Sequence, residues 1–126
     1  MNERYKISEA KFFLARMEES VHDRVAFRYC FSAFLTAARS VIQYAREESR
    51  SKGRQQWYEE AIAGNSVLSH RSQTKIRDRF TDWPGSEDRT GSSRRYSKEL
   101  ISLSHGYIEE LEKFVQRGIE EGVLSG

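Results

Sequence analysis

The chain has 126 residues, a formal net charge of +2, and a composition that is 37% hydrophobic and 12% aromatic. This length predicts one domain, over residues 1–126, that buries a core without disulfide bonds. The single cysteine, Cys30, has no cysteine partner, and the N-terminal residues contain no apolar segment of the signal-peptide type. These observations exclude a disulfide-stabilised scaffold and predict a cytoplasmic protein.

The charges are distributed unevenly along the chain. Residues 46–98 carry twelve Lys and Arg against eight Asp and Glu, whereas residues 99–126 carry two against six. A basic middle segment is compatible with a phosphate-bearing partner, and it is equally compatible with an ordinary solvated surface. Charge alone therefore leaves both interpretations open.

The first predicted element is an amphipathic helix that begins at Ser8. Ser8 is a good N-cap residue, and Ile7 and Phe12 stand in the positions of a hydrophobic staple around it. Apolar residues then recur at helical spacing and form one face, which comprises Ile7, Ala10, Phe13, Leu14, Met17 and Val21.

A long central helix is predicted over the most apolar run, 27-FRYCFSAFLTAARSVIQYAR-46, and continues to about Arg50. Arg28 and Arg39 interrupt this run, which is therefore shorter than the roughly 20 apolar residues of a membrane span. The remaining circumference, which includes Cys30, is predicted to be buried in a bundle. Polar residues in steps of three and four form one stripe along the helix, namely Arg28, Ser32, Thr36, Arg39, Gln43, Arg46 and Arg50.

Turn signals divide the next part of the chain. Gly53 is expected to adopt positive φ in a turn over 51–53, and a short helix over 54–64 follows. Asn65 or Ser66 is then expected to cap a helix over 66–83. Residues 84–95 lack periodicity and are rich in turn-forming residues, so they predict a flexible loop.

The last predicted helix covers about 96–121 and has a wide apolar stripe. Gly106, Gly118 and Gly122 leave room for a close helix crossing, either by a homodimer partner or by the chain itself. No strand pattern of useful length is present. The chain is therefore predicted to be all-α, as an antiparallel four- or five-helix bundle with a long central helix.

Candidate chemistry is limited to cations. One cysteine and three scattered histidines offer no zinc spacing, and no glycine-rich phosphate loop is present, so neither metal nor cofactor is predicted. In 70-HRSQTKIRDR-79, cations four residues apart share a helix face, which suits successive phosphates as well as it suits a solvated face. The candidate nucleic-acid-binding residues are Arg39, His70, Arg71, Lys75, Arg77 and Arg79.

The pairing of FRYCFSAFLTAARSVIQYA with the downstream WYEEA resembles stand-alone members of the HEPN superfamily of prokaryotic helical bundles. The similarity covers about residues 10–83 and is most specific over 32–41. It implies a four- or five-helix bundle, often dimeric, in a superfamily tied to nucleic-acid processing. Many active members are metal-independent ribonucleases with an R-x4–6-H motif, whose arginine contacts the scissile phosphate and whose histidine assists proton transfer.

That motif is incomplete in this chain. The corresponding arginine is Arg77, Asp78 stands where asparagine is usual, and no histidine occurs over 79–83. Arg16 and His22 have a suitable spacing but precede the central helix, and about one such match is expected by chance. Three functions remain open: a bundle that binds RNA or DNA, a ribonuclease that uses Arg77 with His70 or His22, and a dimeric protein-interaction module. The sequence does not decide whether a reaction is catalysed.

Overall fold

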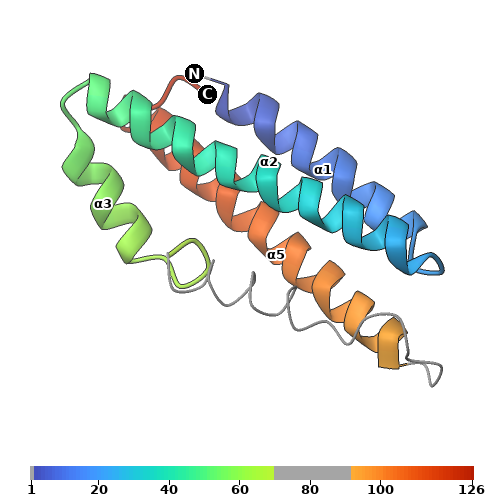
Figure 1. Ribbon diagram of the computed structural model, residues 1–126. Coiled ribbons are helices and arrows are strands. Elements are labelled where there is room, and N and C mark those ends of the chain that lie inside the picture. The colour runs from blue at the N-terminus through green and yellow to red at the C-terminus, as the bar shows by residue number, and fades with distance from the viewer. Residues whose placement is uncertain (1, 70–91) are drawn as a thin grey trace.

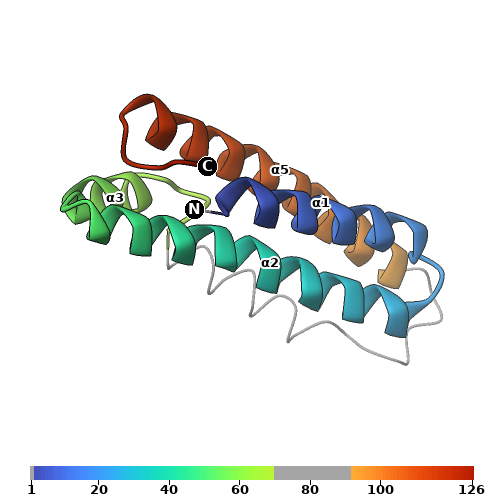
Figure 2. The same ribbon diagram turned by 90° about the horizontal axis from the view of Figure 1, so that it is seen from above.

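A computed structural model describes residues 2–69 and 92–126, and all regular structure within these ranges is helical. The helices are α1 (Glu3–Glu19), α2 (Arg24–Ser51), α3 (Gln55–Ala63) and α5 (Ser92–Glu120). Figures 1 and 2 show α1, α2 and α5 side by side, with α1 running antiparallel to the other two and the short α3 beside the end of α2. The predicted all-α bundle with a long central helix is confirmed.

The central helix α2 supplies three of the six buried aromatic side chains of the described residues. It begins after Asp23, whose carboxylate accepts a hydrogen bond from the backbone N–H of Ala26 at 3.1 Å and so caps the helix. Phe31 and Phe34 are buried, and the Phe34 ring meets Tyr107 of α5 edge-on, with 6.2 Å between centroids. Cys30, predicted to be buried, is half-buried against this core.

Two predicted helix starts are wrong. The first helix begins at Glu3, so Ser8 is an exposed residue inside α1 and not its N-cap, because residues 3–7 already continue the helical pattern with Glu3 and Ile7 buried. The last helix begins at Ser92, so the predicted loop over 84–95 is wrong for its last four residues. Residues 84–91 lie outside the described part of the chain.

The turn predictions hold on both sides of α3. Gly53 adopts a φ of 70°, in the left-handed region. The Asn65 side-chain oxygen accepts hydrogen bonds from the N–H groups of Val67 and Leu68, at 2.8 and 2.9 Å, as a capping side chain does. Residues 66–69 form a turn where a helix was predicted, and 70–83 are not described.

The C-terminal residues close the bundle at one end. After α5 the chain reverses at Gly122, which has a φ of 73°, and buries Val123 and Leu124 against the helices. Ser125 then donates to the Glu48 carboxylate of α2 from its hydroxyl at 2.6 Å and from its backbone N–H at 3.1 Å. Both ends of the chain therefore lie together, as Figures 1 and 2 show.

Candidate nucleic-acid interface

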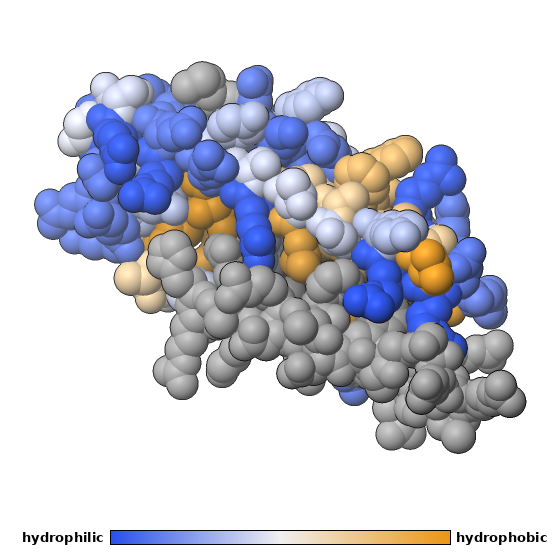
Figure 3. All heavy atoms as spheres, in the orientation of Figure 1, coloured by the Kyte–Doolittle hydropathy of each residue, from blue (hydrophilic) through white to orange (hydrophobic). Residues whose placement is uncertain are grey.

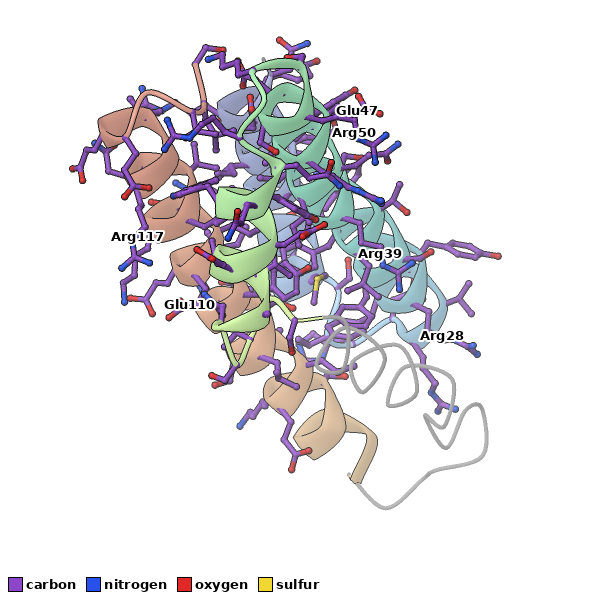
Figure 4. All side chains as sticks on the ribbon, turned by 90° about the vertical axis from the view of Figure 1, so that its left-hand side faces the viewer. Arg28, Arg39, Glu47, Arg50, Glu110 and Arg117 are labelled. Carbon is purple, nitrogen blue, oxygen red and sulfur yellow. The ribbon has the colours of Figure 1, made fainter. Side chains whose placement is uncertain are left out.

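The predicted polar stripe of α2 forms one continuous exposed face. All seven residues of this stripe, from Arg28 to Arg50, are exposed, whereas positions on the opposite side of the helix, such as Phe27, Phe31 and Val41, are buried. Figure 4 shows Arg28, Arg39 and Arg50 along the same side of α2. The alternation of three- and four-residue steps therefore produces the surface that was expected from the sequence, and we call it the arginine stripe.

Three cations of the arginine stripe have no ion-pair partner among the residues that the structure describes. Within residues 2–69 and 92–126, the guanidinium groups of Arg39, Arg46 and Arg50 are in no ion pair, although Glu47 is exposed on the same helix. The polar groups between them are satisfied locally, since the Thr36 hydroxyl donates to the Ser32 carbonyl at 3.1 Å. The stripe thus presents positive charge that the described neighbours do not neutralise.

The inner edge of the stripe borders buried tyrosines. Burial raises the pKa of Tyr107 above its ordinary value, and the positive charge of Arg39 acts in the opposite direction. Tyr58 of α3 is in the same situation with Arg46, because burial raises its pKa while the arginine lowers it. The positive charges of Arg39 and Arg46 therefore act on the buried tyrosines of the core, although both arginine side chains are exposed to solvent.

Most of the other sequence-predicted site residues cannot be placed beside the arginine stripe. His70, Arg71, Lys75, Arg77 and Arg79 all lie outside the described residues, and only Arg39 of that set is described.

The structure does describe the Arg16–His22 pair. Arg16 is turned to its own helix, with an ion pair to Glu19 at 3.5 Å and its guanidinium 5.1 Å from the ring centre of Phe12. His22 is exposed in the turn that follows α1, and no described contact joins it to Arg16.

A second polar cluster, which the sequence did not reveal, lines a cleft of about 210 Å³ between α3 and α5. The Asn65 amide donates to the Glu110 carboxylate at 3.1 Å, and Lys113 lies 3.8 Å from the same carboxylate. Arg117 completes the lining, and Figure 4 shows it with Glu110 on α5, across α3 from the arginine stripe. Two separate charged surfaces therefore flank α3, and only that of α2 is uniformly basic.

No group of three or more His, Cys, Asp or Glu side chains in 2–69 and 92–126 is arranged to hold a metal ion. The helix α2 contains a window with a mean hydropathy of 1.2, apolar enough by length and composition to cross a membrane, a property that core helices of soluble proteins share.

The chain was compared with family models, with curated proteins and with solved structures. None of the three comparisons finds a match.

Proposed function

We propose that this chain is a HEPN-like helical bundle that binds nucleic acid through the arginine stripe of α2. The observation that carries the proposal is the line of three exposed guanidinium groups, Arg39, Arg46 and Arg50, with no described anionic partner. Arginine binds phosphate oxygens through several N–H donors at once, and a row of such groups releases counterions from a phosphate backbone. Phosphate is therefore the ligand chemistry that fits this surface best.

The charge on the rest of the surface supports the same choice. Exposed acids lie on α5 at Glu109, Glu112 and Glu120 and in the following turn at Glu121, so a polyanion is repelled there and attracted at α2. In Figure 3 hydrophilic side chains cover the end of the bundle where α2 meets α3, which is where Arg46 and Arg50 lie in the chain. Binding at this surface requires no catalytic group.

We also propose that the protein is a cytoplasmic homodimer that takes part in nucleic-acid processing. The similarity of residues 32–41 to HEPN proteins supports this cellular context. Light scattering after size-exclusion chromatography measures the oligomeric state. Incubation of the purified protein with RNA distinguishes binding from ribonuclease activity, because only the latter shortens the RNA.

The proposal is tested by fluorescence anisotropy with labelled RNA and DNA at 50 and 200 mM salt. We expect the affinity to fall steeply with salt and to fall at least tenfold in the triple variant Arg39→Ala/Arg46→Ala/Arg50→Ala. For a single strand, the loss of three phosphate contacts also reduces the slope of log K against log salt concentration by about two.

The matched control is Lys11→Ala/Lys113→Ala/Arg117→Ala, which removes the same charge from α1 and α5. We expect this variant to bind nearly as the unmodified protein does, because those residues lie away from α2. Equal losses in the two triple variants mean that net charge alone governs binding, and that result contradicts the proposal. Binding that is insensitive to salt contradicts it as well.

A further inference from the structure

An aromatic side chain that the fold leaves in solvent, Tyr29, flanks the arginine stripe. Tyr29 follows Arg28 and precedes Ser32 by one helical turn, and 73% of its surface is exposed, more than for any other large hydrophobic residue in the described ranges. A tyrosine ring on the surface retains a free face, and such a face beside cations is typical of proteins that stack unpaired bases.

The straightness of α2 restricts the shape of the nucleic acid. Arg39 and Arg50 are about 16 Å apart along the helix axis, and Tyr29 and Arg50 are about 31 Å apart, at 1.5 Å per residue. A duplex strand winds through a full turn in about 34–36 Å, so neither strand of a duplex stays on this line. A flexible single strand follows it without distortion.

The packing of α2 also disfavours the other way in which a basic helix reads a duplex. A helix that enters the major groove has a diameter of about 10–12 Å in a groove about 12 Å wide, so its neighbours must leave about half of its circumference free. Here α1, α3 and α5 all pack against α2, and only the arginine stripe and its margins reach solvent. The bundle therefore contacts a nucleic acid from one side only.

We propose that the arginine stripe binds an unpaired strand of RNA or DNA, with its phosphates along Arg39, Arg46 and Arg50 and a base stacked on Tyr29. This inference rests on the proposed function and adds the strandedness of the ligand and a second recognition element. The stacking contact is indifferent to salt, whereas the arginine contacts weaken with it, so the two contributions are separable in one titration.

The experiment compares a labelled 12-nucleotide single strand, as RNA and as DNA, with the duplex of the same sequence at one salt concentration. We expect the single strand to bind at least tenfold more tightly. Tyr29→Ala is expected to weaken single-strand binding by about 5- to 150-fold, since stacking contributes about 1–3 kcal/mol per base. The salt slope is expected to stay unchanged in this variant because no charge is removed.

Two variants serve as controls. Tyr29→Phe retains the ring and is expected to bind as the unmodified protein does. Tyr5→Ala removes the other strongly exposed tyrosine, which is on α1 and 68% exposed, and is expected to have no effect. Circular dichroism confirms that each variant folds, as expected for changes at exposed positions.

The outcomes separate this inference from the proposed function. If the duplex binds as tightly as the single strand, or Tyr29→Ala has no effect while the arginine variant does, the inference is overturned and the proposed function stands. If neither strand form is bound, both are overturned. If single strands bind more tightly than the duplex and Tyr29→Ala weakens that binding, the inference is supported. A preference for single-stranded RNA over DNA, or the reverse, then shows whether the ligand contains ribose or deoxyribose.

Discussion

At the scale of single residues, the most unusual side chain is Glu48, a buried carboxylate near the end of α2. Burial acts to raise the pKa of Glu48, but hydrogen bonds from Glu3 and Ser125 outweigh it, and the pKa lies below its ordinary value. Glu3 has the opposite shift, because burial and the hydrogen bond to Glu48 both raise its pKa. The pKa values of the two carboxyl groups are therefore shifted in opposite directions, and Glu48 is the more acidic of the pair.

The pH dependence of stability follows from these directions. Glu48, with its lowered pKa, stabilises the fold above the ordinary glutamate pKa near 4.5, and that contribution is lost as the pH falls through the folded-state pKa. Glu3, with its raised pKa, stabilises the fold below that ordinary value, and its contribution is lost as the pH rises through its own folded-state pKa. The pair is most favourable while Glu48 is ionised and Glu3 is protonated.

We expect Glu48→Gln to lower the free energy of unfolding by about 1–3 kcal/mol at pH 7, because the charged acceptor for Ser125 is lost. The difference in the free energy of unfolding between this variant and the unmodified protein should narrow towards pH 3, because the stabilisation by ionised Glu48 falls progressively below about pH 4.5. Urea unfolding at several pH values measures both effects. Glu47→Gln removes the same charge from an exposed neighbour and should change stability by less than about 0.5 kcal/mol. A constant difference across pH contradicts this assignment.

At the scale of elements, the glycines of α5 have different roles that only their surroundings disclose. A Cβ added to Gly118 would lie 2.5 Å from Cδ1 of Leu124 and 3.0 Å from the Trp57 ring. A Cβ added to Gly106 would meet no atom within 4 Å. The absence of a side chain at Gly118 therefore lets Leu124, one of the chain's own C-terminal residues, pack closely against α5.

We expect Gly118→Ala to lower the free energy of unfolding by about 1–3 kcal/mol, because Leu124 and Trp57 must move to admit the methyl group. Gly106→Ala should instead raise it by about 0.5–1 kcal/mol, since alanine is the better helix former and the space is open. Thermal and urea unfolding of the two variants measures the contrast. Similar effects of the same sign at both glycines would show that helix propensity, and not packing against Leu124, governs these positions.

Hydrophobic periodicity predicted the central helix and its arginine stripe because both depend on spacing within one segment. The same spacing puts Glu48 on the buried side of α2, three residues after the buried Ala45. A glutamate at such a position is normally predicted to be exposed, because the sequence does not reveal that Ser125, far away in the chain, donates a hydrogen bond to it. The Asn65–Glu110 contact joins residues 45 positions apart, so no local pattern reveals the cleft between α3 and α5. The start of α1 was missed because Ser8 is a good cap residue inside a helix that tertiary packing extends to Glu3.

At the scale of the whole molecule, the basic residues of the arginine stripe and the exposed acids of the C-terminal segment lie on different helices. The arginine stripe lies on α2, the exposed acids of the C-terminal segment lie on α5, and the exposed large hydrophobic residues of the described ranges lie on α1 and the first turns of α2. Figure 3 shows apolar spheres at the end of the bundle where α1 leads into α2, and also in the middle of the same face. Contacts such as the hydrogen-bonded pair of His105 and Glu18, at 2.8 Å, join α5 to α1.

The closure of the bundle depends on its last four residues, which bring α5, α2 and the first turn of α1 together. Removal of residues 123–126 is expected to lower the free energy of unfolding by about 4–9 kcal/mol, because Val123 and Leu124 are buried and contribute about 1.5–3 kcal/mol each, and the Ser125 donors to Glu48 are lost as well. Removal of 125–126 alone should cost about 1–3 kcal/mol, since it leaves the apolar pair in place and removes the Ser125 donors to Glu48. Urea unfolding gives the two free energies, and hydrogen exchange at Arg4, whose N–H donates to the Gly126 carbonyl at 3.4 Å, reports the local opening. Equal losses for the two truncations would mean that the Glu48 contacts, and not apolar burial, fasten the C-terminal residues to the bundle.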